Sequence, residues 1–147
     1  MFLGHLVLIY PKKDIKINYT WAAKPFLIDE GIVKNHKYQI WWVCGWPTAY
    51  VLPLHPLTPE QIDKCPCHGG VTSYYDVFTS ENRLHLTPYI GWDYFHSGDY
   101  RCSFDGSFQE YESGNKKWTY KEIMSDINDV IDYLEKIYQQ NDEKNIN

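Results

Sequence analysis

"TYKEIMSDINDVIDYLEKIY", residues 119–138, decides the fold class of this chain. Its apolar residues recur at the three- and four-residue spacing of an amphipathic helix: Ile123, Ile127, Val130, Ile131, Leu134, Ile137 and Tyr138. At its start, Thr119 and Glu122 have the spacing of a capping box, and Trp118 and Ile123 that of a hydrophobic staple. We therefore expect a long C-terminal helix that packs its apolar stripe on a sheet.

The segments before this helix are rich in β-branched and aromatic residues and predict strands over 2–10, 37–46, 48–54, 70–78 and 83–95. Pro47 separates two of them, so we expect a bent pair there. Thr58, Pro59 and Gln61 predict one short helix, which Cys65-Pro66 should end. This order indicates an α+β fold, a mainly antiparallel sheet with a short helix and a long C-terminal amphipathic helix packed on it.

Length and composition set the remaining bounds on the fold. A chain of 147 residues suits one domain, which we place at 1–138, followed by a frayed polar tail at 139–147. Aromatic residues make up 17% of the chain. A β-rich core accounts for most of this excess, and the alternative is a pocket lined by rings.

Charge and cysteine content bear on partners and location. A net charge of −5 argues against general nucleic-acid binding but permits a small nucleotide in a pocket. The N-terminal stretch lacks the features of a signal peptide, and no segment has the length of a membrane span, so we expect a cytoplasmic protein. The four cysteines should then be free thiols.

The stretch "GWDYFHSGDY", residues 91–100, is the first place where the sequence suggests chemistry. Asp93, His96 and Asp99 stand three residues apart among aromatic side chains. A partly dry pocket would strengthen the action of these groups on a ligand or metal, with Trp92 and Tyr94 as its lining. We interpret the stretch as the end of a strand that enters a loop of the site.

A second stretch, "CPCHGGVTS" at 65–73, contributes His68 followed by Gly69 and Gly70, which allow the backbone to approach a ligand closely. Imidazole and carboxylate suit zinc or another divalent metal. The predicted ligands are His68, Asp93 and His96. Asp99 would orient a histidine or act as base, and His55 would act as acid or contact the substrate. The competing interpretation is a hydrogen-bonded network that braces two loops.

The cysteines offer a separate metal hypothesis. Cys65, Cys67, His68 and Cys102 could form a structural zinc site. Cys65 and Cys67 lack the two-residue gap that paired zinc cysteines usually have, so we rank this site below the histidine–carboxylate site.

Four stretches in order, "CGWPTAYVLPLHPL", "HGGVTS", "YIGWDYFHSGDY" and the final helix, resemble a family of small proteins from bacteriophages and their bacterial hosts. The family's most specific motifs are HGG(L/V)T and IG(F/W)DxxHxGD. Tyr94 and Phe95 depart from its usual Cys and Ala. The resemblance implies a phage or prophage setting in a bacterial cytoplasm and a host defence protein as partner. It points to His55, His68, Asp93, His96 and Asp99, and it implies no particular reaction.

These residues lead us to expect a metal-assisted hydrolase that acts on a phosphate-containing small molecule such as a nucleotide signal. Lys64, Arg83 and Arg101 are the cations nearest in sequence that could contact phosphate. The alternative is a non-catalytic binder that sequesters a small nucleotide-like ligand or blocks a host defence protein.

Overall fold

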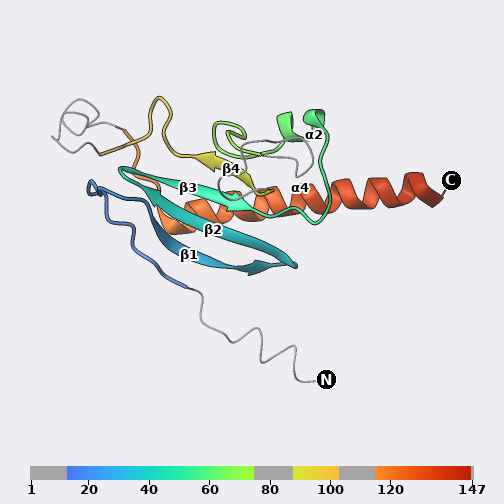
Figure 1. Cartoon of the computed structure of the whole chain (residues 1–147), viewed down its shortest axis with the longest axis horizontal. Coiled ribbons are helices and arrows are strands. Elements are labelled where there is room, and N and C mark those ends of the chain that lie inside the picture. The colour runs from blue at the N-terminus through green and yellow to red at the C-terminus, as the bar shows by residue number, and fades with distance from the viewer. Residues whose placement is uncertain (1–12, 75–87, 103–114, 147) are drawn as a thin grey trace, which may run out of the picture.

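A four-stranded antiparallel sheet forms the centre of the fold in this computed structural model, which describes residues 13–74, 88–102 and 115–146. The strands are β1 (Phe26–Val33), β2 (His36–Val43), β3 (Trp46–Val51) and β4 (Ile90–Asp93), and they lie side by side in that order (Figure 1). The predicted α+β class is confirmed. The predicted strand at 2–10, and parts of those at 70–78 and 83–95, lie outside the described residues.

Two-residue turns join the first three strands. Lys34 and Asn35 link β1 to β2 with φ values of 48° and 67°, and Cys44-Gly45 links β2 to β3, with φ of 63° at Cys44. The predicted break at Pro47 was therefore wrong, because Pro47 pairs with Trp42 inside β3. Proline is tolerated there because it lacks only a donor, and its carbonyl still accepts the Tyr94 N–H at 3.0 Å.

Both predicted helices are present with their predicted starts. In α2 (Pro59–Asp63), Thr58 and Gln61 form the capping box, and the helix ends before Cys65-Pro66. At the start of α4 (Tyr120–Ile146), Glu122 Oε1 accepts the Thr119 N–H at 3.0 Å and Thr119 Oγ1 accepts the Glu122 N–H at 3.2 Å. The helix continues past residue 138 to Ile146.

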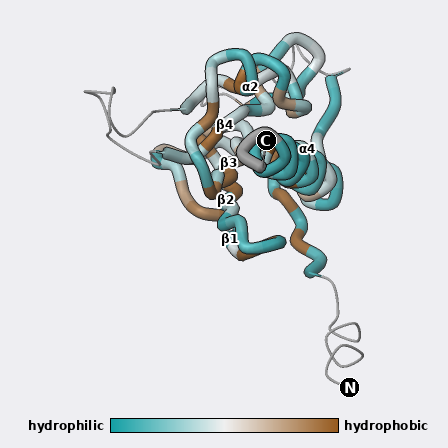
Figure 2. The backbone as a smooth tube through the Cα atoms, turned by 90° about the vertical axis from the view of Figure 1, so that its right-hand side faces the viewer, coloured by the Kyte–Doolittle hydropathy of each residue, from teal (hydrophilic) through white to brown (hydrophobic). Residues whose placement is uncertain are grey.

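The core lies between α4 and one face of the sheet, as the view along the helix shows (Figure 2). Six of the seven predicted stripe residues of α4 are buried, and Tyr138 is half-buried. Trp92 and Tyr94, which carry β4 into the following loop, are both fully buried in this core. Among the described residues, no helix is long and apolar enough to cross a membrane.

Candidate metal centre

Three side chains from two loops converge beside the end of β4: His68, His96 and Asp99. His68 follows α2 in a turn closed by a 3.1 Å hydrogen bond from the Gly70 N–H to the Cys67 carbonyl. After β4 the chain turns back on itself, and the Asp99 N–H donates to the His96 carbonyl at 2.9 Å. Both loops are thus fixed by their own backbone hydrogen bonds.

The Asp99 carboxylate is the hub of this cluster and is only 2% exposed. His68 Nε2 lies 3.0 Å from Oδ1 and 2.8 Å from Oδ2. Trp118 Nε1 donates to Oδ1 at 2.8 Å, and the His96 backbone N–H donates to Oδ2 at 2.9 Å. These donors compensate the cost of burying the charge.

One nitrogen of the His96 ring, Nδ1, lies close to two carboxylates. It lies 3.5 Å from Asp99 Oδ2 and 3.6 Å from Asp93 Oδ1, and this buried atom has no hydrogen-bond partner within the described residues. The ring rests against the backbone of Gly69, where an added Cβ would lie 2.3 Å from Cε1. Glycine at position 69 is therefore what allows the two loops to meet.

Two aromatic rings pack against the ring of His68. Its ring is parallel to that of Tyr94, with 5.0 Å between centroids and 4° between planes, and Trp118 lies 4.5 Å away. The Tyr94 hydroxyl donates to Asp126 Oδ2 of α4 at 2.6 Å. Burial and this hydrogen bond raise the pKa of Tyr94, so its hydroxyl stays a donor at any physiological pH.

The three side chains could hold a metal ion, because each offers one ligand atom and all of these lie within 4.8 Å of one another. Ligands at about 2.0–2.1 Å in a tetrahedral site are separated by roughly 3.3 Å. The spacings of 2.8 and 3.5 Å from Asp99 Oδ2 to the nearest His68 and His96 nitrogens bracket that value. A buried histidine nitrogen without a partner, next to a carboxylate, fits the same donor set.

The predicted ligand set differs from this cluster in one residue. Asp99 occupies the place expected for Asp93, whose Oδ1 accepts the Phe95 N–H at 3.1 Å and lies 3.6 Å from His96 Nδ1 without joining the cluster of three. Periodicity could not distinguish the two aspartates, because both stand three residues from His96.

His55 lies apart from the cluster. Its exposed ring packs against that of Tyr138, with 4.8 Å between the ring centroids. Tyr138 lies twelve residues beyond Asp126 on α4, which is about 18 Å further along the helix axis at 1.5 Å per residue. Trp92 and Tyr94 were expected to line the ligand pocket; both side chains are fully buried in the core, where the Tyr94 ring packs against that of His68. Of the glycines, Gly69 contacts a site residue and Gly70 faces open space.

The cysteines are free thiols, as predicted, and none joins a metal-ligating group among the described residues. Cys102 is hydrogen-bonded through its backbone N–H to the Gly45 carbonyl, at the β2–β3 turn. A hydrogen bond to Cys67 and burial raise the pKa of the Cys65 thiol, which favours the protonated form rather than a thiolate ligand.

Three cations lie over aromatic rings near Asp99, on the two segments that pair at Asp99 and Lys116. Arg101 lies over Phe95 at 4.7 Å, Lys116 over Trp118 at 3.9 Å and Lys117 over Tyr100 at 4.6 Å. Lys116 also pairs with Glu122 at 2.6 Å. Of the other predicted cations, Lys64 pairs with Glu60 on α2, and Arg83 lies outside the described residues.

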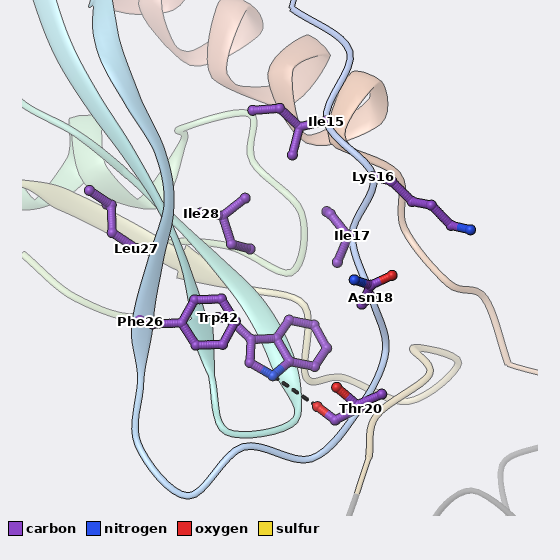
Figure 3. Close-up of a pocket in the computed structure, with 9 residues that line it drawn as sticks. All are labelled: Ile15, Lys16, Ile17, Asn18, Thr20, Phe26, Leu27, Ile28 and Trp42. Atoms are coloured by element: carbon purple, nitrogen blue, oxygen red, sulfur yellow. Dashed lines mark hydrogen bonds between the residues drawn. The ribbon is translucent and has the colours of Figure 1, made fainter.

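A separate pocket of about 320 Å³ lies between the segment at 15–20 and the start of β1, over the Trp42 ring (Figure 3). Its walls are mostly apolar: Ile15, Ile17, Phe26, Leu27 and Ile28, with Lys16, Asn18 and Thr20 at one side. Among the described residues that line it, Lys16 is the one with a titratable side chain, so these residues provide no acid–base pair. The pocket shares no residue with the His68, His96 and Asp99 cluster.

Comparison with protein-family models, characterised proteins and solved structures finds no match to this chain. The resemblance to phage proteins therefore stays a prediction. Sequence reasoning missed two contributors to the site, Trp118 and Asp126, whose side chains bond Asp99 and Tyr94. A tryptophan directly before a capping box was visible as a signal, but it indicated packing rather than a hydrogen bond to a site carboxylate.

Proposed function

We propose that this protein is a small metal-assisted hydrolase centred on His68, His96 and Asp99. The observation that carries the proposal is the His96 Nδ1 atom, buried without a hydrogen-bond partner and 3.5 Å from the Asp99 carboxylate. Native proteins rarely leave buried polar atoms unpaired, and a bound ion is one of the standard reasons for an exception. The donor set of two imidazoles and one carboxylate suits zinc.

A divalent ion with three protein ligands supplies a Lewis acid and lowers the pKa of a bound water toward neutrality. The chain's residues provide the rest. His68 and His96 keep side-chain exposures of 23% and 32%, so their rings reach the protein surface, whereas the Asp99 side chain is buried beneath them. Asp93, whose Oδ1 is 3.6 Å from His96 Nδ1 and whose side chain is 25% exposed, is the carboxylate we propose as the base.

Cations near Asp99 could contact an anionic substrate such as a phosphate-containing small molecule. In a chain of net charge −5, Arg101, Lys116 and Lys117 gather on the two segments that flank Asp99. Contact with aromatic faces holds these cations in place, at about 0.5–1 kcal/mol each for exposed pairs. Lys116 is already paired with Glu122, and Arg101 and Lys117 are the cations we propose for contact with a phosphate group.

The experiment is a screen of phosphorylated small molecules, nucleotides among them, with purified protein in the presence of zinc and of a chelator. Turnover that requires metal and is strongly lowered in Asp99→Asn, which removes a charged ligand of the ion, supports the proposal. Products that form equally in chelator, or in Asp99→Asn, contradict it.

A second candidate function is sequestration of a small ligand, which the pocket over Trp42 favours because about 320 Å³ suits a small molecule and its walls carry no catalytic pair. Under this function, mass spectrometry after heat release would recover a stoichiometric, chemically intact ligand. Trp42→Ala would abolish its retention, whereas Asp99→Asn would not.

A further inference from the structure

We propose that Trp118 is a positioning residue of the metal centre and holds the plane of the Asp99 carboxylate in its orientation beside the two histidine rings. This inference rests on the proposed metal site and adds a residue to it. Trp118 stands immediately before the capping box of α4 and was expected only to pack there.

The two oxygens of Asp99 have different surroundings. Oδ1 accepts the Trp118 indole N–H at 2.8 Å, whereas Oδ2 is the oxygen nearer to the His96 ring, at 3.5 Å from Nδ1. The two oxygens are chemically equivalent, so a half turn of the carboxylate restores the same arrangement, but any smaller rotation about the side-chain bond moves both oxygens out of these positions. The indole N–H opposes such a smaller rotation, because its charge-assisted hydrogen bond to Oδ1, which contributes about 1.5–3 kcal/mol, would be weakened.

Metal binding makes the indole more important. When His68 Nε2 binds an ion, it can no longer donate to Asp99, although it now lies 2.8 Å from Oδ2. Among the described residues, Trp118 is then the one whose side chain still donates a hydrogen bond to the Asp99 carboxylate. Donors of this kind orient a ligand and adjust its basicity, and their removal typically lowers metal affinity by 10- to 100-fold.

Trp118 is itself fixed by contacts of its backbone and its ring. The Tyr19 hydroxyl donates to the Trp118 backbone carbonyl at 2.7 Å, and the Lys116 ammonium lies 3.9 Å from the centre of the indole ring. The next residue, Thr119, is the N-cap of α4. The orientation of Asp99 is therefore coupled to the start of the C-terminal helix.

The test compares Trp118→Phe, which keeps an aromatic ring and removes the N–H, with wild type. Zinc affinity is measured by competition with a chromophoric chelator, and we expect a 10- to 100-fold loss. The matched control is Trp41→Phe, which removes another half-buried indole donor, bonded to Gln39 Oε1 at 2.9 Å and away from the site. The control should keep wild-type affinity, and thermal melts check that both variants are folded.

A spectroscopic readout separates orientation from packing. In the ¹H–¹⁵N spectrum of wild type, the indole resonance that disappears in Trp118→Phe should shift when zinc is added. An unshifted resonance together with unchanged affinity in the variant overturns this inference and leaves the metal centre intact. A wild-type protein that binds no metal overturns the proposed function instead. If Trp118→Phe fails to fold, the Trp118 indole resonance is assigned by sequential assignment of the wild-type spectrum, and its zinc-dependent shift decides alone.

Discussion

His96 Nδ1 lies 3.5 Å from Asp99 Oδ2, buried and without a hydrogen bond, although its own backbone N–H donates to that same oxygen at 2.9 Å. An unpaired buried polar atom costs about 1–3 kcal/mol. If the cluster were only a structural network, a hydrogen bond between His96 Nδ1 and Asp99 Oδ2 would stabilise the fold. The uncompensated atom therefore favours a ligand over a purely structural network.

Gly69→Ala should weaken metal binding more than Gly70→Ala. Both glycines have a positive φ, 70° and 85°, so each substitution carries a similar backbone strain of about 1–2 kcal/mol. Only the Cβ at 69 would meet the His96 ring, within 2.3–2.7 Å, while at 70 there is nothing within 4 Å. Zinc titrations and thermal melts of both variants test this. Equal zinc affinities in the two variants would show that the position of His96 does not matter for binding.

Asp29→Asn should remove part of the acid sensitivity of the fold. Asp29 is buried and accepts hydrogen bonds from Tyr120 at 2.6 Å, Tyr38 at 2.9 Å and Lys13 at 2.9 Å. Burial opposes its ionisation, but the bonds from the two tyrosines and Lys13 outweigh burial and hold the pKa of the carboxyl below its usual 3.8.

A depressed folded-state pKa stabilises the protein above the ordinary carboxyl pKa, and this stability is lost as the pH falls through the folded-state value. At neutral pH we expect Asp29→Asn to lower the free energy of unfolding by about 1–3 kcal/mol. Urea unfolding between neutral pH and about pH 2 should show the difference from wild type shrinking as the pH falls. A constant difference across this range would contradict the assignment.

Ile131→Ala should destabilise the domain by about 2–5 kcal/mol, because Ile131 is fully buried in the stripe of α4 and truncation leaves a cavity. Ser125→Ala, at an exposed position of the same helix, is the control and should change stability by less than about 0.5 kcal/mol. Chemical denaturation of both variants measures the effect. Similar stabilities would mean that α4 does not cover the sheet.

The fold class and both helix starts could be predicted because capping boxes and helical periodicity are local signals. The turn at Cys44-Gly45 was misplaced because Pro47 is a stronger breaker in sequence than Cys44, and only pairing with Trp42 shows that this proline sits within a strand. Strand β1 was not predicted at all. It is an edge strand whose exposed Phe26 and Ile32 and buried Asp29 reverse the usual pattern of a half-buried strand.

The site was predictable in its residue types but not in its geometry. His68 and His96 were identified because glycines and carboxylates surround them, and they do converge. Sequence spacing could not show that Asp99 rather than Asp93 points between them, since that depends on the turn that follows His96. His55 was grouped with them for its rigid surroundings, but contact with Tyr138 holds it elsewhere.

The most direct test of the central claim is the zinc content of the purified protein, measured by elemental analysis after zinc is supplied and unbound metal removed. We predict close to one ion per chain in wild type and in His55→Ala, whose exposed histidine lies away from the cluster. The combined His68→Ala and His96→Ala variant should retain none while still melting cooperatively. Wild type without bound metal, or equal metal in the double variant, would contradict the metal centre.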